Sequence, residues 1–429
     1  MKPCLAAALV CTGLAAAVPA TAHADFGPPQ PLSPTYYASG ADIDLGIEDD
    51  GDAAAVYSDF GGGGVWWRRR TAAGTLGSIV TLSGDGTGES DVAVDPVTGR
   101  ALAVWIKRDP ATRSLVVRGR FRNADGTFGN AFSVSSTAQT IYGLRAAMNR
   151  SGQAAVAWLR HDGAVYRAQV RTIAADGTMA AVGTVSPAGA DASSLDLAID
   201  PSGNADAVWT RLSGDFVITE LAERRTNGTT AYTRTMSAPQ DGTSAPRVAT
   251  DPAGGAIVVW GANADGDQAV RLRRLRPDGT LGTEQRVSGV GDEASEPDVA
   301  VDPKGDAMVA WEALTADGEV VQLRSRRADG VMGFIQTADA GTDAAVAVDR
   351  LGNPVLAWHR PGGGVAASVH GAAGPAQTVS AAAGGPSAEE KPALVENRSG
   401  YALLGWNLPQ QGQFGSGKPM VSAAPPPAP

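Results

Sequence analysis

The chain has 429 residues, of which 43% are hydrophobic and 19% charged, with 54 Gly and 27 Pro. This apolar content is enough for a large core and excludes a wholly disordered chain. The net charge of −10 argues against a nucleic-acid-binding protein, which needs a basic surface. The length alone allows two or three domains or one large closed β structure.

Residues 1–24 have the pattern of a secretory signal peptide. Lys2 gives a positive start, an apolar run follows, and small residues end the segment at Ala24. We expect cleavage after Ala24 and a secreted, monomeric product. Cys4 and Cys11 both lie in the segment, so the mature chain is cysteine-free and has no thiol chemistry. No later stretch is long and apolar enough to predict a membrane span.

An internal repeat covers almost all of the remaining sequence. A Gly is followed six residues later by an aromatic residue eight times, and seven of the nine tryptophans occupy this position. Successive aromatic residues lie 47 to 53 residues apart. The eight aromatic residues are Tyr57, Trp105, Trp158, Trp209, Trp260, Trp311, Trp358 and Trp406.

Each repeat predicts four short strands joined by tight turns. The first strand alternates in polarity, as in residues 298–302, and ends in a turn that often reads Asp-Pro-x-Gly, as in residues 200–203. The second strand runs into the repeat aromatic residue, and the third is rich in Val, Leu and Arg. The fourth ends in Val-Ser, as at residues 287–288. The third residue of the first strand is small in seven repeats, which suits a crowded wall around a channel.

Four strands in about 50 residues, repeated eight times, predict an all-β, eight-bladed β-propeller over residues 25–423. The pattern resembles the blades of secreted bacterial β-propeller repeat proteins and matches no single functional family. A seven-bladed propeller is the alternative. A string of β-sandwiches is disfavoured because each unit is too short. A Pro-rich tail follows at residues 424–429.

The last repeat is too short to hold its own third and fourth strands. Near the start of the mature chain, residues 27–33 echo residues 282–288, which we interpret as a turn and a fourth strand. We therefore predict that residues 30–33 supply the outermost strand of the blade formed by residues 391–423. This arrangement removes the seam at which the ring would otherwise open.

Charged residues recur at one position of the predicted first strands. We expect them at one mouth of the central channel, where they bind a polar ligand or neutralise one another. The last two repeats have Ala345 and Ala393 at this position. The candidate ligand-binding residues are Asp44, Asp91, Arg145, Asp196, Arg247 and Asp298. None of them stands out as a nucleophile or base, so we assign no catalytic residue.

Three further patterns favour structural interpretations. The acidic turns at residues 48–52 and 263–267 leave calcium as the alternative to no cofactor. Arginines alternate along several third strands, as at residues 118–122, where they either grip an anionic polymer or cover the outer surface and pair with acids. We favour the second interpretation. The histidines at positions 161, 359 and 370 form no metal or triad pattern.

These observations favour an exported, non-catalytic binding or scaffold module that recognises a carbohydrate, a cell-envelope polymer or a protein. The alternative is a polysaccharide hydrolase or lyase with its site at the channel mouth. The fold alone does not choose between the two. The regular repeat length favours binding, because we expect an enzyme to interrupt the repeats with a long loop.

Overall fold

The computed structural model describes residues 25–426, except 86–87, 110, 139, 265, 317, 370–375, 381–390 and 411–415. The predicted signal peptide, His370, part of the second acidic turn and the end of the tail lie outside the described residues. The described part of the chain contains no helix that is long and apolar enough to cross a membrane.

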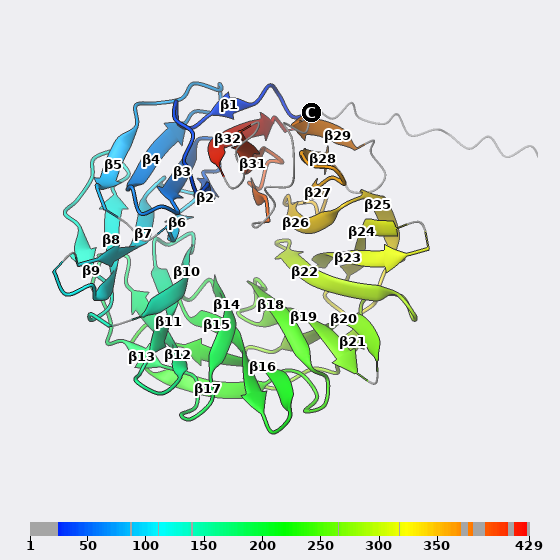
Figure 1. The fold of residues 1–429 in the computed structure, drawn as a ribbon. Helices are drawn as coiled ribbons and strands as arrows, with labels where there is room; N and C mark the ends of the chain where they lie inside the picture. Colours follow the sequence, from blue (N-terminus) through cyan, green and yellow to red (C-terminus); the bar gives the residue numbers. More distant parts are fainter. Residues whose placement is uncertain are drawn as a thin grey trace, which may run out of the picture.

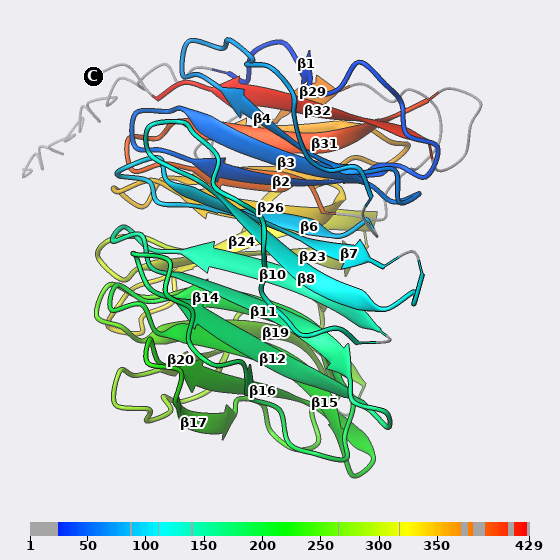
Figure 2. The same ribbon diagram turned by 90° about the vertical axis from the view of Figure 1, so that its left-hand side faces the viewer.

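The described residues form eight four-stranded antiparallel sheets, arranged as blades around a central axis (Figures 1 and 2). The prediction of an eight-bladed β-propeller is confirmed, and the seven-bladed alternative is wrong. The innermost strands are β2 (Ala41–Ile47), β6 (Ser90–Val94), β10 (Ile141–Met148), β14 (Ala192–Ile199), β18 (Thr243–Thr250), β22 (Glu293–Val301), β26 (Thr342–Val348) and β30 (Ala393–Glu396). The second strands are β3 (Ala53–Asp59), β7 (Ala101–Arg108), β11 (Ala154–His161), β15 (Ala205–Ser213), β19 (Ala256–Ala264), β23 (Ala307–Thr315), β27 (Pro354–His359) and β31 (Ala402–Pro409).

The outer half of each blade is less regular than the inner half. The third strands are β4 (Val65–Arg70), β8 (Leu115–Arg122), β12 (Tyr166–Ile173), β16 (Phe216–Arg224), β20 (Asp267–Leu275), β24 (Gly318–Arg326), β28 (Val365–Val369) and β32 (Gly417–Ala424). The outermost strands are β5 (Val80–Ser83), β9 (Phe132–Ser133), β13 (Gly183–Thr184), β17 (Thr230–Thr235), β21 (Gln285–Arg286), β25 (Gln336–Ala340), β29 (Gln377–Ser380) and β1 (Gln30–Pro31). The Ser of the predicted Val-Ser ending extends this short pairing, since Ser288 Oγ accepts the N–H of Val270 at 3.1 Å.

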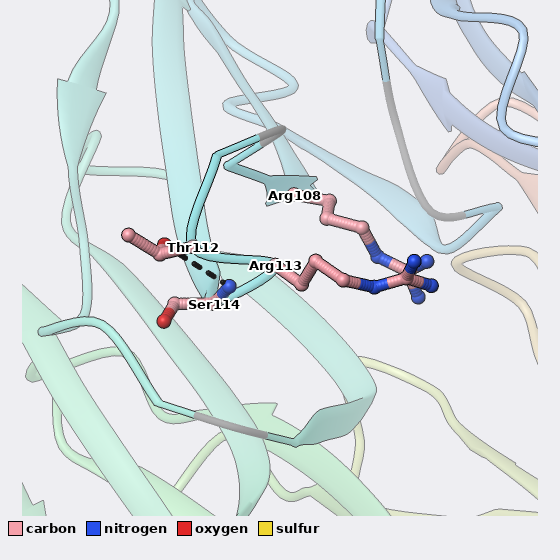
Figure 3. Close-up of a pocket in the computed structure, with 4 residues that line it drawn as sticks. All are labelled: Arg108, Thr112, Arg113 and Ser114. Carbon is pink, nitrogen blue, oxygen red and sulfur yellow. Dashed lines mark hydrogen bonds between the residues drawn. The ribbon is translucent and has the colours of Figure 1, made fainter.

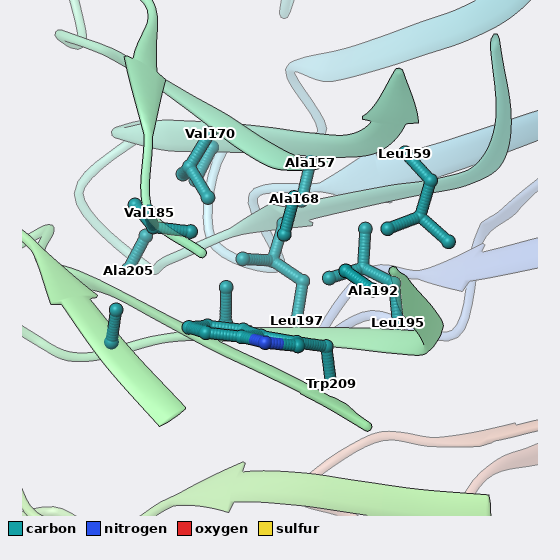
Figure 4. Packing of buried hydrophobic residues seen from close by; sticks show 13 residues of the cluster. Ala157, Leu159, Ala168, Val170, Val185, Ala192, Leu195, Leu197, Ala205 and Trp209 are labelled. Carbon is teal, nitrogen blue, oxygen red and sulfur yellow. The ribbon is translucent and has the colours of Figure 1, made fainter. Parts of the chain in front are cut away.

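The repeat aromatic residue packs each blade against the preceding one. Trp209 of the fourth blade is fully buried against Ala168 and Val185 of the third blade (Figure 4). A cluster of this kind lies at each of the eight junctions between blades, and Tyr57 takes the place of the Trp between the last blade and the first. One sheet buries too little apolar surface to be stable alone, so these junctions hold the fold together.

The N-terminal strand completes the last blade, as predicted. β1 pairs with β32, with Gln30 opposite Val421 and Pro31 opposite Met420. The neighbouring Leu32 is fully buried, and its N–H donates to the carbonyl of Pro419 at 2.8 Å. The two chain ends are therefore joined within one sheet (Figure 1).

The hydrogen bond at the junction that closes the ring is equivalent to one between two blades inside the ring. Arg68 of the first blade donates from Nη1 to the carbonyl of Leu32 at 2.9 Å. In the same way, Arg324 donates to the carbonyl of Val287 in the preceding blade, also at 2.9 Å. Leu32 thus occupies the position of the Val in the predicted Val-Ser ending.

Candidate functional site

The six candidate residues lie at equivalent positions in the channel wall. Each is the residue three places before the last residue of its innermost strand. Because a strand rises about 3.3 Å per residue, this position is roughly 10 Å from the strand end. The position therefore lies away from the mouth at which the innermost strands end, and a ligand site formed by these charges stays a prediction.

A β-bulge precedes this position in five successive blades, from the third to the seventh. The bulge residue has a left-handed conformation, which L-residues other than Gly, Asn and Asp rarely adopt. The bulge residues are Gly143, Ser194, Ala245, Glu296 and Asp343, with φ between 43° and 65°. The sequence did not indicate the bulges, because only the third blade uses Gly there.

Three of the candidate aspartates fasten neighbouring blades together. Asp91 Oδ2 accepts the backbone N–H of Ala146 in the next blade at 2.7 Å. Asp196 and Asp298 form the equivalent bonds, both at 2.9 Å, with the N–H groups of Val248 and Val346. Hydrogen bonds between a carboxylate and a backbone N–H are strong, so these oxygens have a structural role.

The charges along the wall partly neutralise one another. Arg145 Nε lies 4.0 Å from Asp196 Oδ1 and also faces Asp91 and Asp44. Burial raises the pKa of Asp91 to about 6, against the opposing effect of Arg145. On the other side of the axis, Lys391 faces Asp298 and Arg247. The sequence analysis missed Lys391, which lies two residues before the candidate position of the last blade.

A pocket of about 380 Å³ lies at the end of the axis where the innermost strands end. We call it the mouth pocket. Strand ends and turns from the second to the eighth blade line it, including Met148, Ile199, Thr250 and Val301. Four turn prolines, Pro96, Pro201, Pro252 and Pro303, give it an apolar wall. Its size and mixed lining are those of a small-ligand site.

Most aspartates of these turns accept hydrogen bonds from backbone N–H groups of their own turn. Asp302 shows the pattern: Oδ1 accepts the N–H groups of Lys304 and Asp306 at 2.8 and 3.0 Å. Its Oδ2, however, is buried with no hydrogen-bond partner among the described residues. A buried oxygen without a donor is costly, and Asp302 is one of the residues that line the mouth pocket.

Glu396, the last residue of β30, is the most perturbed acid of the mouth pocket. Its Oε2 is also buried and has no partner among the described residues. Burial raises the pKa of Glu396 to about 9, and the nearby Asp349 raises it further. At neutral pH the carboxyl is therefore uncharged and both donates and accepts hydrogen bonds.

Two arginines give the mouth pocket its positive charge. Arg150 of the third blade forms a two-pronged ion pair with Asp49 of the first blade, with Nη1 2.9 Å from Oδ1, and this bond lowers the pKa of Asp49. Arg398 forms no ion pair with any described residue, so its guanidinium is available to a ligand. Both replace the Pro of the usual Asp-Pro-x-Gly turn, a departure from the repeat that could have marked them in the sequence.

The other sequence candidates have structural contacts. Arg120 and Arg324 on the third strands donate from Nε to turn carbonyls of their own blades, at 2.8 and 2.7 Å. These contacts support the structural interpretation of the arginine pattern. In the first acidic turn, Asp52 pairs with Arg69. Within the described ranges, no group of three His, Cys, Asp or Glu side chains is arranged to hold a metal ion.

No protein-family model and no curated protein matches this chain. Similar solved structures include a fungal alcohol oxidase of the AA5 family in complex with copper, with 10% identity over 95% of this chain and 77% of that chain, at a TM-score of 0.50. The polysaccharide lyase Uly1 has 10% identity over 90% of each chain and a TM-score of 0.48. The β-propeller domain of the Trilobed protease from Pyrococcus furiosus has 8% identity over 80% and 96%, at 0.47. At these identities the likeness shows the fold alone.

Proposed function

We propose that this chain is an exported, non-catalytic binding module that takes a carbohydrate in the mouth pocket. One observation carries the proposal: Glu396 and Asp302, which line the pocket, each have a buried carboxyl oxygen without a partner among the described residues. Sugar hydroxyls both donate and accept, so they match a neutral carboxyl, a carboxylate and the guanidinium of Arg398. The proline faces suit the C–H faces of a sugar ring. Export rests on the signal-peptide pattern of residues 1–24.

The charged residues of the channel wall extend the proposed site along the axis. A ligand that extends about 10 Å from the mouth pocket along the axis would reach the level of Arg145 and Arg247. The paired aspartates there are engaged with backbone N–H groups. Catalysis by two carboxylates along the wall is therefore less well supported than binding.

Substitutions at Glu396 test the site. We expect Glu396→Leu to weaken glycan binding at least about tenfold, because one buried hydrogen bond to the ligand is lost. Glu396→Gln keeps a donor and an acceptor and is expected to bind like the wild type at pH 7. A glycan array with the purified mature protein finds the ligand, and titration calorimetry then gives the affinities.

The pH dependence and a neighbouring variant serve as controls. Wild-type binding is expected to fall as pH rises through about 9, because Glu396 loses its proton there, whereas the Gln variant keeps its affinity. Lys304→Ala changes an exposed residue of the same turn as Asp302 and should leave binding unchanged. Equal binding by the Leu and Gln variants would contradict the proposed site.

The second candidate function is hydrolysis or lyase cleavage of a polysaccharide at the same pocket. It is favoured by Glu396, a protonated carboxyl that could act as a general acid in a pocket that Asp302 also lines. A turnover screen on the glycans that bind separates the two functions. Product formation that Glu396→Gln abolishes, with binding retained, would establish the enzyme.

A further inference from the structure

The loop between β7 and β8 is one of the longer connections between a second and a third strand. It spans residues 109–114, whereas only two residues join the second and third strands in the fourth, fifth and sixth blades. Since this loop follows a second strand, it lies at the end of the axis opposite the mouth pocket. The extra residues therefore build a feature unrelated to the pocket described above.

Asp109 holds the backbone of residues 111–113 through hydrogen bonds. The Oδ1 atom of Asp109 accepts the N–H groups of Ala111 and Thr112, both at 2.9 Å. The carbonyl of Asp109 accepts the N–H of Arg113 at 2.8 Å, and Arg113 has a φ of 60°. Residues with a side chain rarely adopt this left-handed conformation, so the loop holds Arg113 in a strained backbone conformation.

The loop brings two arginine side chains together. The side chains of Arg108 and Arg113 are extended and point in the same direction (Figure 3). With Thr112 and Ser114 they line a pocket of about 290 Å³. Neither arginine forms an ion pair with any residue that the structure describes. A bound anion would balance two positive charges that line one pocket.

We propose that Arg108 and Arg113 form a binding site for a phosphate or sulfate group, free or as an ester. One carboxylate has two oxygens and one charge, which a single guanidinium fork satisfies. Two adjacent forks instead match a tetrahedral oxyanion with three or more oxygens and up to two charges. The one nearby lysine on this strand, Lys107, is paired with Asp85 at 3.3 Å, so the two arginines carry the site.

Calorimetric titration of the full mature protein with inorganic phosphate, sulfate and acetate tests the proposal. We expect one phosphate or sulfate per chain and at least about tenfold weaker binding of acetate. Glucose 6-phosphate serves as the ester probe. Binding as tight as that of inorganic phosphate identifies an ester as the natural form, and binding of inorganic phosphate alone identifies the free ion.

Three variants distinguish a loss of phosphate binding from a loss of folding stability. Arg113→Gly suits the left-handed φ, so its melting temperature should equal or exceed that of the wild type while phosphate affinity falls at least about tenfold. Arg108→Ala should lose affinity to a similar extent. Arg276→Ala removes an exposed guanidinium on the fifth blade with the same change of charge and should bind like the wild type. Unchanged binding by Arg113→Gly, or an equal loss in Arg276→Ala, would overturn the proposal.

Discussion

Replacing Leu32 by Ala is expected to lower the free energy of unfolding by about 2–4 kcal/mol, because Leu32 is fully buried at the junction that closes the ring. It packs with Tyr57 of the first blade and Val421 of the last. The same junction also has hydrogen bonds, since Tyr57 Oη donates to the carbonyl of Leu32 at 3.2 Å. A loss of this size is a large share of the stability of an ordinary domain.

Urea denaturation followed by tryptophan fluorescence gives the measurement. Leu351→Ala is the matched control, because Leu351 is 58% exposed and its truncation should change stability by less than about 0.5 kcal/mol. Val287→Ala tests the equivalent position inside the ring and should destabilise as well. If Leu32→Ala unfolds like the control, residues 30–33 do not close the propeller.

Replacing Asp206 by Ala is expected to stabilise the protein at pH 7 by about 1–4 kcal/mol. Asp206 is 2% exposed, its Oδ1 has no partner among the described residues, and it lies directly opposite Glu223 on the next strand. Burial raises the pKa of Asp206 well above its usual value, and Glu223 raises it further. The other seven repeats have an apolar residue here: Ala54, Leu102, Ala155, Ile257, Met308, Val355 and Leu403.

The gain depends on pH in a defined direction. In the unfolded chain Asp206 ionises near pH 4, whereas in the folded chain it holds its proton to higher pH, so its presence costs stability as pH rises above about 4. The difference between the variant and the wild type should therefore grow as pH rises above about 4 and level off once the pH exceeds the raised pKa of folded Asp206. Asp215→Ala, at an exposed turn of the same blade, is the control. Unfolding curves that show no stabilisation at pH 8 would refute this account.

The sequence by itself determined the architecture, because the architecture is periodic. A Gly and an aromatic residue six positions later, repeated eight times, specify a turn and a buried junction in every blade. The closing strand could be predicted because residues 27–33 resemble an internal fourth strand. The structure shows the physical reason: the carbonyl of Leu32 receives the same arginine hydrogen bond as that of Val287.

The tertiary structure alone decided the candidate site. Sequence spacing placed Asp91 and Asp196 at a common level, but it could not show that their oxygens bind the next blade, because those partners lie more than 50 residues away. The perturbation of Glu396 likewise depends on burial among the turns of other blades. A repeat pattern reports what the blades share. A ligand site depends on where they differ, as at Glu396, Arg398 and Arg113, and on which of those differences the closed ring brings together.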